Sequence, residues 1–329
     1  MNEKEIFSKA EEWLESGLEI VIITVIETWG SSPRPVGSSM IVNSKNEIIG
    51  SVSGGCIENF VFAKSLEVFK SDVHQILEFG VTNSQAWEVG LTCGGKIKVL
   101  LEKFSKKDLK TIKKINTIFS DEGKLVLLTN LSTGKREVIE KSSKQDKILS
   151  KVFNNEISKI NILDNTSWFS KVFSSQYKII IIGAVHISEA LVKIANVLNF
   201  KVFLIDPRTN FDEKKFKEKA TLLKEWPDEG LRKLNVNEKT CIVTLTHDPK
   251  LDDPAIIYSL QSNPLYIGCL GSTKTHKARM ERLIRKGFTN KQLSKINGPV
   301  GLDIKAKTPS EIACSIIAEI VLRKNSNAV

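Results

Sequence analysis

The hydrophobic pattern of the first hundred residues switches between helical and strand-like spacing. Apolar residues three and four positions apart predict amphipathic helices, while β-branched and alternating runs predict strands. The predicted elements are helices within residues 1–17 and 56–70 and strands at residues 19–26, 74–79 and 96–101. This order predicts an N-terminal α/β domain over residues 1–103.

The middle of the chain has a weaker pattern, and we interpret residues 104–176 as a connecting segment with a helix and a hairpin. The two strand-like runs of the hairpin flank the turn-forming residues Asn130–Gly134. The predicted elements are a helix at residues 104–118, a hairpin of residues 124–129 and 135–140, an exposed polar tract at residues 141–151, and an extended linker with one extra strand at residues 152–176.

From residue 177 onward, short continuous apolar runs replace the alternating ones, which is typical of strands buried in a parallel sheet. A strand, a tight glycine turn, a helix and a second strand follow one another as in a βαβ unit. The predicted strands are residues 178–182, 201–206, 240–246 and 265–270, with helices at residues 189–198, 274–286 and 309–323. We predict a Rossmann-like, doubly wound domain over residues 177–329.

The βαβ unit carries part of a dinucleotide-binding fingerprint. Gly183 begins the turn, and Asp206 ends the second strand about 20 residues later, where a ribose contact would lie. However, Val185 and Ser188 occupy the positions of the second and third fingerprint glycines. A side chain at residue 185 would obstruct the usual approach of a pyrophosphate, and a βαβ unit needs no nucleotide to explain it. NAD(P) binding therefore stays an alternative.

Two histidines lie in loops where ligands of α/β sheets are expected. His186 follows the glycine turn, and His247 follows the strand at residues 240–246. His186 is either a polar group at the sheet edge or a functional imidazole, and the four histidines of the chain show no metal-ligand spacing.

Two glycine-rich loops in the first hundred residues each carry a cysteine. Gly54 and Gly55 precede Cys56 at the start of a predicted helix, where the helix dipole favours a thiolate. Cys93 lies 37 positions further on and is followed by Gly94 and Gly95. The glycines allow a ligand to approach the backbone, and N–H groups at such turns can hold a phosphate. Each cysteine is alternatively a small buried hydrophobe.

A stiff loop precedes these motifs. Its twelve residues, 27–38, hold two prolines and two glycines, and Arg34 stands between the prolines. A guanidinium held in this way can contact an anion, or it can point into solvent.

Composition narrows the class of protein. The chain has 329 residues, 41% hydrophobic and 26% charged, and no apolar run long enough to span a bilayer. The net charge of +10 comes from lysines scattered through helical stretches, so we predict neither a nucleic-acid nor a membrane partner. Five cysteines without CxxC spacing indicate neither a disulfide framework nor a zinc ribbon, and the polar N-terminus predicts a cytoplasmic protein.

Taken together, these motifs resemble the XdhC/CoxI family of xanthine dehydrogenase accessory proteins, across nearly the whole chain. The motifs, in chain order, are Gly30-Ser31-Ser32-Pro33-Arg34, Gly54-Gly55-Cys56-Ile57-Glu58, Gly90-Leu91-Thr92-Cys93-Gly94-Gly95, Gly183-Ala184-Val185-His186, Thr246-His247-Asp248, Tyr266-Ile267-Gly268, Leu270-Gly271-Ser272, Gly298-Pro299-Val300-Gly301-Leu302-Asp303 and Lys307-Thr308-Pro309-Ser310-Glu311-Ile312-Ala313.

The resemblance implies an accessory protein rather than an enzyme. Family members bind molybdenum cofactor (molybdopterin, plain or as the cytosine dinucleotide), assist replacement of an oxo by a sulfido ligand with a cysteine desulfurase, and pass the cofactor to an apo molybdenum hydroxylase. It further implies a homodimer. Cys56 and Cys93 carry over as candidate molybdenum or sulfur contacts. The other candidate cofactor contacts are Arg34, Gly54, Gly55, Glu58, Gly94, Gly95, Gly183, His186, Asp206 and His247.

Two departures from the family pattern bear on function. Val185 replaces a glycine of the family's Gly-Ala-Gly-His motif, which weakens a nucleotide role, and Lys305 replaces a glycine near the C-terminus. The residues leave two further hypotheses open: an NAD(P)-dependent Rossmann oxidoreductase, and a scaffold that binds partner proteins without touching cofactor.

Overall fold

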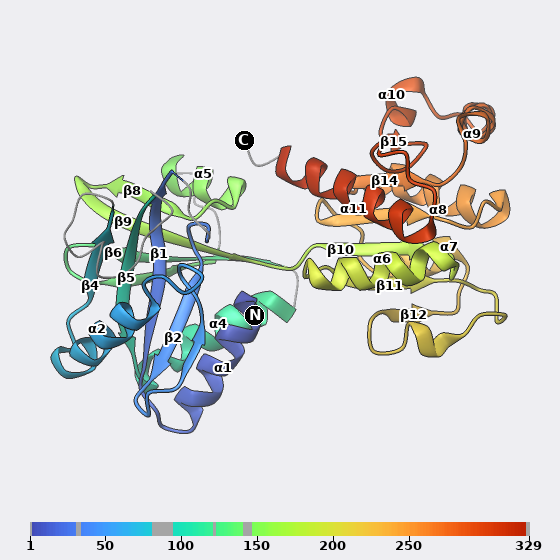
Figure 1. Ribbon diagram of the computed structural model, residues 1–329. Coiled ribbons are helices and arrows are strands. Elements are labelled where there is room, and N and C mark those ends of the chain that lie inside the picture. The colour runs from blue at the N-terminus through green and yellow to red at the C-terminus, as the bar shows by residue number, and fades with distance from the viewer. Residues whose placement is uncertain (1, 31–33, 81–94, 121–122, 141–146, 327–329) are drawn as a thin grey trace. The chain divides into compact units, whose positions relative to one another are not determined.

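The computed structural model describes residues 2–30, 34–80, 95–120, 123–140 and 147–326 (Figure 1). Within it the chain forms two compact units, Met1–Ser175 and Gln176–Val329. Among the described residues, no helix is both long and apolar enough to cross a membrane.

The first unit is built on a five-stranded antiparallel sheet with the strand order β3-β2-β1-β5-β4. Its strands are β1 (Ile20–Trp29), β2 (Ser39–Asn43), β3 (Ile48–Gly50), β4 (Gln75–Phe79) and β5 (Lys96–Phe104). Because side chains alternate along a strand, Val21 and Ile23 of β1 face one side of the sheet while Ile20 and Ile22 face the other.

Helices cover both faces of this sheet. Helix α2 (Glu58–Ser71) packs through Val61 and Val68 onto the face that holds Val21 and Ile23. On the other face lie α1 (Glu3–Glu15) and α4 (Leu109–Ser120), the latter preceded by the short 3-10 helix η1 (Lys106–Asp108). The amphipathic helix predicted within residues 1–17 is confirmed as α1.

A second sheet follows in the same unit, with the strand order β7-β6-β9-β8. Its elements are β6 (Lys124–Asn130), β7 (Arg136–Ile139), α5 (Lys147–Asn155), β8 (Lys159–Leu163) and β9 (Thr166–Ser174). The predicted hairpin is confirmed as β6 and β7. Leu125 and Phe173 of this sheet share one apolar core with Ile6 and Ile22, so the segment predicted as a connection contributes to the core of the first unit.

Over residues 152–176 we predicted an extended linker with one extra strand, and the structure has two strands there instead of one strand and a linker. β8 and β9 form a hairpin, and β9 also pairs with all of β6. The turn consists of Asp164 and Asn165, which both have positive φ angles of 47° and 58°. This is the two-residue hairpin turn that Asn and Asp favour, so a local signal was present in the sequence.

The second unit is a six-stranded parallel sheet with the order β12-β11-β10-β13-β14-β15. Numbered from β10 as the first, this is the 3-2-1-4-5-6 order of a doubly wound dinucleotide-binding fold. The Rossmann-like prediction is confirmed. The strands are β10 (Lys178–Ile182), β11 (Lys201–Ile205), β12 (Thr221–Leu223), β13 (Thr240–Thr244), β14 (Tyr266–Cys269) and β15 (Ile296–Asn297).

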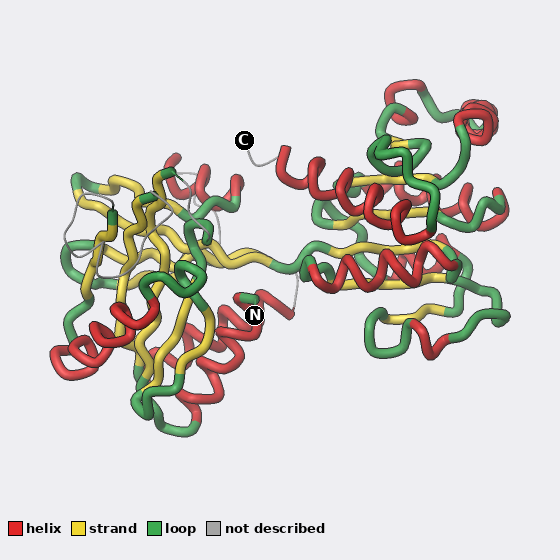
Figure 2. Tube along the Cα trace, in the orientation of Figure 1, coloured by secondary structure: helices red, strands yellow, loops and turns green. Residues whose placement is uncertain are grey.

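Helices cover both faces of the parallel sheet (Figure 2). α6 (His186–Val197) and α11 (Pro309–Ser326) pack onto the face that holds Ile179 and Ile181. α7 (Pro227–Lys233) and α8 (Pro249–Ser262) pack onto the face that holds Ile180 and Ile182. The remaining helical elements are η2 (Glu213–Lys215), α9 (Thr273–Arg285) and α10 (Asn290–Leu293).

Candidate functional site

The strands that flank the motif loops of the first unit all begin or end toward the same end of its first sheet, with Ser39 opposite Thr24 and Lys96 opposite Trp29. β2 begins at Ser39, whose carbonyl accepts a hydrogen bond from the N–H of Ser51, just after the end of β3. β5 begins at Lys96, which pairs with Trp29 at the end of β1, and β4 ends beside this start of β5. We call this strand-end region the motif edge, defined by Trp29, Ser39, Gly50, Phe79 and Lys96. The Cys56 loop begins there, and so does the chain between β4 and β5 that carries Cys93.

Glu58, the first residue of α2, organises the Cys56 loop. One carboxylate oxygen, Oε1, accepts from the Ser51 hydroxyl at 2.6 Å and from the N–H groups of Ser53 and Val52 at 2.9 and 3.2 Å. The other, Oε2, accepts from the Ser53 hydroxyl and from the N–H of Gly55 at 2.9 Å. Five donors of its own loop therefore surround this carboxylate.

These hydrogen bonds control the charge of Glu58. Burial alone would raise its pKa, but the hydrogen bonds from the Ser51 and Ser53 hydroxyls and from the backbone outweigh burial and lower the pKa from 4.5 to about 2. Glu58 is thus an anion at neutral pH, and the loop closes around its charge. Whether Glu58 also contacts a cofactor stays a prediction.

The backbone N–H groups of this loop are already in use. Besides the three that donate to Glu58, Gly54 donates to Ser51 Oγ, and Cys56 and Ile57 donate to Ser53 Oγ at 3.0 Å each. All six N–H groups from residue 52 to residue 57 have a partner inside the loop. The groups expected to hold a phosphate are therefore occupied here by the loop's own side chains.

The exposed part of the loop consists of the two glycines and, next to them, the half-buried thiol of Cys56. Cys56 lies one residue before the N-cap of α2, is half-buried, and packs against the apolar core under the helix. Gly54 and Gly55 are exposed and have positive φ angles of 80° and 120°. Among the described residues, a Cβ at Gly55 would meet no other atom within 4 Å. The glycine side of the loop is therefore open next to the thiol.

The other predicted residues of the first unit are only partly described. Cys93 and Gly94 lie outside the described residues, and Gly95 is buried just before β5. Arg34 is half-buried next to the exposed Pro35. The proximity of Cys56 and Cys93 stays a prediction.

The remaining cysteines of the described chain differ from Cys56. Cys241 and Cys269 lie inside the parallel sheet, where burial raises the pKa of their thiols to about 12 and about 11. Cys314 is exposed on α11. In the part of the chain that the structure describes, no cluster of three His, Cys, Asp or Glu residues is arranged to hold a metal ion. The described protein groups therefore do not form a metal cage.

Two cavities open at the motif edge. The smaller, of about 290 Å³, is lined by Glu27, Thr28, Trp29, Glu78, Lys96, Ile97 and Lys98, and we call it the Trp29 cavity. The larger, of about 670 Å³, lies between the two sheets and is lined by Ile26, Glu27, Thr28, Val36, Ile76, Lys98, Leu131, Ser158, Lys159, Ile160 and Ser167. Both share Glu27, Thr28 and Lys98. Their volumes are in the range of small-molecule sites.

An ion pair stands where the two cavities meet. Lys98 Nζ lies 2.9 Å from Glu27 and 3.7 Å from Glu78, and its hydrogen bond to Glu27 raises the pKa of Lys98. Our sequence reasoning missed this pair. The sequence signal that could have indicated it is the end of the apolar run of β1 at Glu27. In the structure, the register between β1 and β5 shifts at the same place, after Val25.

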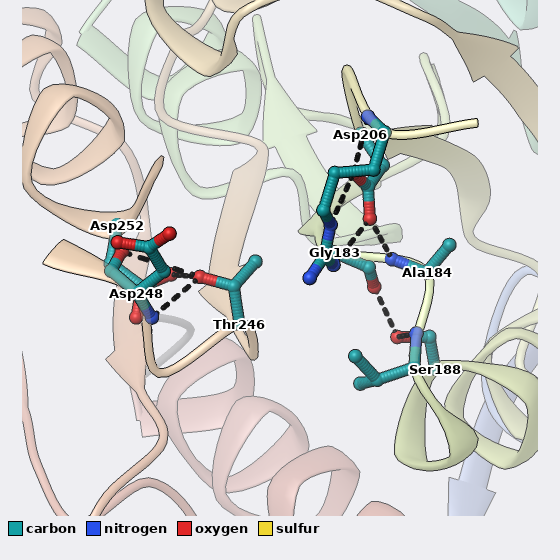
Figure 3. Close-up of polar contacts among 9 residues, drawn as sticks. Gly183, Ala184, Ser188, Asp206, Thr246, Asp248 and Asp252 are labelled. Carbon is teal, nitrogen blue, oxygen red and sulfur yellow. Dashed lines mark hydrogen bonds and ion pairs between the residues drawn. The ribbon is translucent and has the colours of Figure 1, made fainter. Parts of the chain in front are cut away.

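In the second unit, the side chains of Ser188 and Asp206 form hydrogen bonds with the glycine turn (Figure 3). Gly183 has a φ of 105°, and a Cβ there would lie 2.6 Å from Thr246 Cγ2. The Ser188 hydroxyl donates to the Gly183 carbonyl and accepts from the N–H of Val185. Ser188, which replaces a fingerprint glycine, thus binds the turn to α6.

Asp206 also turns back onto this loop (Figure 3). Its Oδ2 accepts from the N–H of Ala184 and from Arg208 Nη2, each at 2.7 Å, and its Oδ1 accepts from the N–H and Nε of Arg208, each at 2.9 Å. Burial opposes the charge, but these hydrogen bonds outweigh it and lower the pKa of Asp206. Four donors fill the acceptor positions of the carboxylate, so the oxygen expected to bind a ribose hydroxyl already has partners.

The loop after β13 is held in a similar way. Thr246 Oγ1 donates to Asp252 at 2.7 Å and accepts from the N–H of Asp248 at 3.1 Å (Figure 3). Between them His247 is exposed with a φ of 62°, and the side chain of His186 at the start of α6 is 86% exposed. His186 Nδ1 lies 3.7 Å from Glu189 Oε1, and His247 lies near enough to Asp252 to act on its carboxyl group.

Two protein-family models match this chain. One, described as the XdhC and CoxI family, matches residues 13–80, which include the Cys56 loop. The other, described as the XdhC Rossmann domain, matches residues 179–320 of the second unit.

Individual relatives align over most of the chain. It is 24% identical over 315 residues to the molybdenum cofactor insertion chaperone PaoD of Escherichia coli (strain K12). This alignment covers 94% of this chain and 85% of PaoD. It is 24% identical over 326 residues to a probable xanthine dehydrogenase subunit of Bacillus subtilis (strain 168), covering 96% of each. A crystal structure of a protein described as a xanthine dehydrogenase from Bacillus halodurans aligns with a TM-score of 0.78 at 23% identity, covering 99% of this chain and 96% of that one. That likeness shows the fold.

Proposed function

The chain belongs to the XdhC and CoxI family, and from this premise we propose that it is a maturation chaperone for molybdenum cofactor. In this proposal it binds the cofactor and passes it to a xanthine dehydrogenase-type molybdenum hydroxylase. The names of the two relatives, a cofactor insertion chaperone and a probable xanthine dehydrogenase subunit, support this assignment.

The observation that carries the proposal is the motif edge. The half-buried thiol of Cys56 stands beside the exposed glycines 54 and 55, on a loop that Glu58 holds in shape. Thiolates are suitable ligands for a soft, sulfur-rich metal centre, so the residues fit the cargo. The cavities lined by β1 and β5 have the volume to hold the organic part of the cofactor.

A carrier must also release what it binds. In the described residues Cys56 does not belong to a group of three or more His, Cys, Asp or Glu side chains that could hold a metal ion, which favours a contact that can be broken over a closed cage. We include in the proposal that the protein assists sulfuration of the cofactor with a cysteine desulfurase, accepts the plain or cytosine dinucleotide form, and acts as a homodimer.

The experiment measures how much molybdenum copurifies with the protein from cells that make the cofactor. We expect the double variant Cys56→Ala, Cys93→Ala to retain at least about 10-fold less molybdenum than the wild type, because both candidate soft ligands are lost. Metal analysis and the fluorescence of the oxidised pterin provide two independent readouts.

Cys314→Ala is the matched control, because this thiol is exposed on a helix of the second unit. It should retain the wild-type amount. Full retention by the double variant would remove both cysteines from cofactor binding. Binding of a client hydroxylase by a protein that never retains cofactor would instead favour the scaffold hypothesis.

A further inference from the structure

The Trp29 cavity combines an exposed aromatic wall with a charged edge. Trp29 ends β1 with 69% of its surface exposed, and Ile97, which is buried, lies on the neighbouring strand β5. A large exposed indole at the mouth of a cavity is available for stacking on a planar ligand.

The charged groups at the cavity are two carboxylates, which accept hydrogen bonds, and one ammonium group, which donates them. Glu27 and Lys98 lie side by side with 2.9 Å between Oε2 and Nζ, and Glu78 is 3.7 Å from the same Nζ. Lys98 uses Oε2 of Glu27, and the side chains of Glu27 and Lys98 are partly exposed at 56% and 30%. A ligand at this edge would therefore meet a carboxylate next to an ammonium group.

We propose that the Trp29 cavity binds a planar ring through a 2-amino-4-oxopyrimidine edge, the edge that pterins share with guanine. The amino and ring N–H groups of that edge would donate to Glu27, and the adjacent oxo group would accept from Lys98. Trp29 stacks on the ring face. This inference rests on the proposed function, because the molybdenum cofactor that the chain is proposed to carry contains a pterin, and it gives the pterin a place separate from the Cys56 loop.

The size of the site agrees with a ring that carries further groups. The cavity of about 290 Å³ shares Glu27, Thr28 and Lys98 with the cavity of about 670 Å³ between the sheets. If a bicyclic ring occupies the Trp29 cavity, the larger cavity between the sheets can hold the rest of the ligand. Two-point hydrogen bonding of such an edge discriminates by about 10-fold or more against a ring that lacks it.

The experiment uses the full chain purified without cofactor and measures the fluorescence polarisation of 6-hydroxymethylpterin. We expect saturable binding, and binding at least about 10-fold weaker for lumazine, which has an oxo group in place of the amino group. Glu27→Gln should weaken pterin binding by about 10-fold, because the amide offers an N–H where an acceptor is needed. Trp29→Leu should weaken it by a similar factor through lost stacking.

Two matched controls test the assignment. Glu137→Gln removes a carboxylate that pairs with Lys135 on the second sheet, and Trp226→Leu removes the half-exposed tryptophan of the second unit. Both should bind pterin within about 2-fold of wild type. Guanosine monophosphate is the second ligand. Binding of both ligands supports recognition of the shared edge, and tighter binding of the nucleotide than of the pterin assigns the site to guanine nucleotides instead.

Each remaining outcome separates this inference from the proposed function. Equal binding of lumazine and pterin, or unchanged pterin binding in Glu27→Gln and Trp29→Leu, overturns the cavity assignment even if the wild type retains molybdenum. Glu27-dependent pterin binding by a protein that never retains molybdenum supports the cavity assignment while the proposed function fails.

Discussion

Each unit contains a glycine turn that a carboxylate holds in shape, and the hydrogen bonds that do so differ between the two units. Each lies between a strand and a helix, and in each a carboxylate accepts hydrogen bonds from the backbone of the turn. Glu58 accepts from several N–H groups in the first unit, and Asp206 accepts from one, that of Ala184, in the second. Glu58 is surrounded by hydroxyl and N–H donors of its own loop, whereas most of the donors to Asp206 belong to Arg208.

The difference lies in what each turn leaves exposed. Around Gly183, the Thr246 side chain occupies the space that a Cβ at residue 183 would need, and the Ser188 hydroxyl donates to the Gly183 carbonyl. Around Gly55 no atom of the described chain fills it, and the half-buried Cys56 stands beside it. Two glycine turns thus differ in the space beside the glycine: Thr246 packs against Gly183, whereas the space beside Gly55 is open.

Gly183→Ala should produce the largest change. The new methyl group would meet Thr246 Cγ2 at 2.6 Å on a backbone with φ of 105°, and Thr246 cannot rotate freely because its hydroxyl is bonded to Asp252. We expect the unfolding free energy of the second unit to fall by about 3 kcal/mol. Urea unfolding followed by hydrogen exchange of peptides from β10 measures it.

Peptides from β1 and β5 of the first unit are the internal control and should keep their protection in Gly183→Ala. Unchanged protection of β10 would mean that the turn around residue 183 is loose, and the contrast between a closed and an open turn would be lost.

Glu58→Gln should have an intermediate effect, with a defined pH dependence. The lowered pKa corresponds to roughly 3 kcal/mol at neutral pH, and partial exposure to solvent reduces the expected loss to about 1 to 2 kcal/mol. Because the folded-state pKa is depressed, this stability is present above the ordinary value of 4.5 and is lost as pH falls toward about 2. Urea unfolding at pH 7, 4 and 3 should show the gap between wild type and variant narrowing.

Glu67→Gln on the same helix is the control, because Glu67 is exposed and pairs only with nearby side chains such as Lys64. Its effect should stay within about 0.5 kcal/mol at each pH. A gap for Glu58→Gln that does not change with pH would show that the carboxylate is not ionised in the folded loop, and the account of how this turn is held would fail.

Gly55→Ala should have the smallest effect. Its φ of 120° strains any side chain, but the added Cβ faces open space, so only the backbone cost of about 1 kcal/mol is expected, the lower end of the range for a strained residue. The same urea series measures this value, with hydrogen exchange of peptides from α2. A loss as large as that of Gly183→Ala would indicate that residues near Gly55 cover it, and that the two turns do not differ.

Local pattern predicted most of the fold. The continuous apolar runs at residues 178–182 and 240–244 form parallel strands with both faces covered, because such runs leave no polar side to face solvent. The spacing of Ile6, Ala10 and Trp13 likewise placed α1. The hairpin of β8 and β9 was missed, although Asp164-Asn165 is a turn signal, because the strands beside it alternate weakly.

The candidate site was predicted less completely. The Cys56 loop was found from its glycines, but the Glu27–Lys98 pair joins residues 71 positions apart, and no periodicity reports a contact across strands. The local pattern of hydrophobic and polar residues likewise did not predict the roles of Glu58 and Asp206, because these roles depend on which donors come within hydrogen-bond distance.

The sequence by itself determined the order of the elements, the parallel sheet of the second unit and the positions of its glycine turns, since these follow from side-chain period and backbone freedom. Only the tertiary structure decided which turn is open. That outcome depends on close approaches, such as Thr246 against Gly183, and on carboxylates that take the nearest donors before any ligand can.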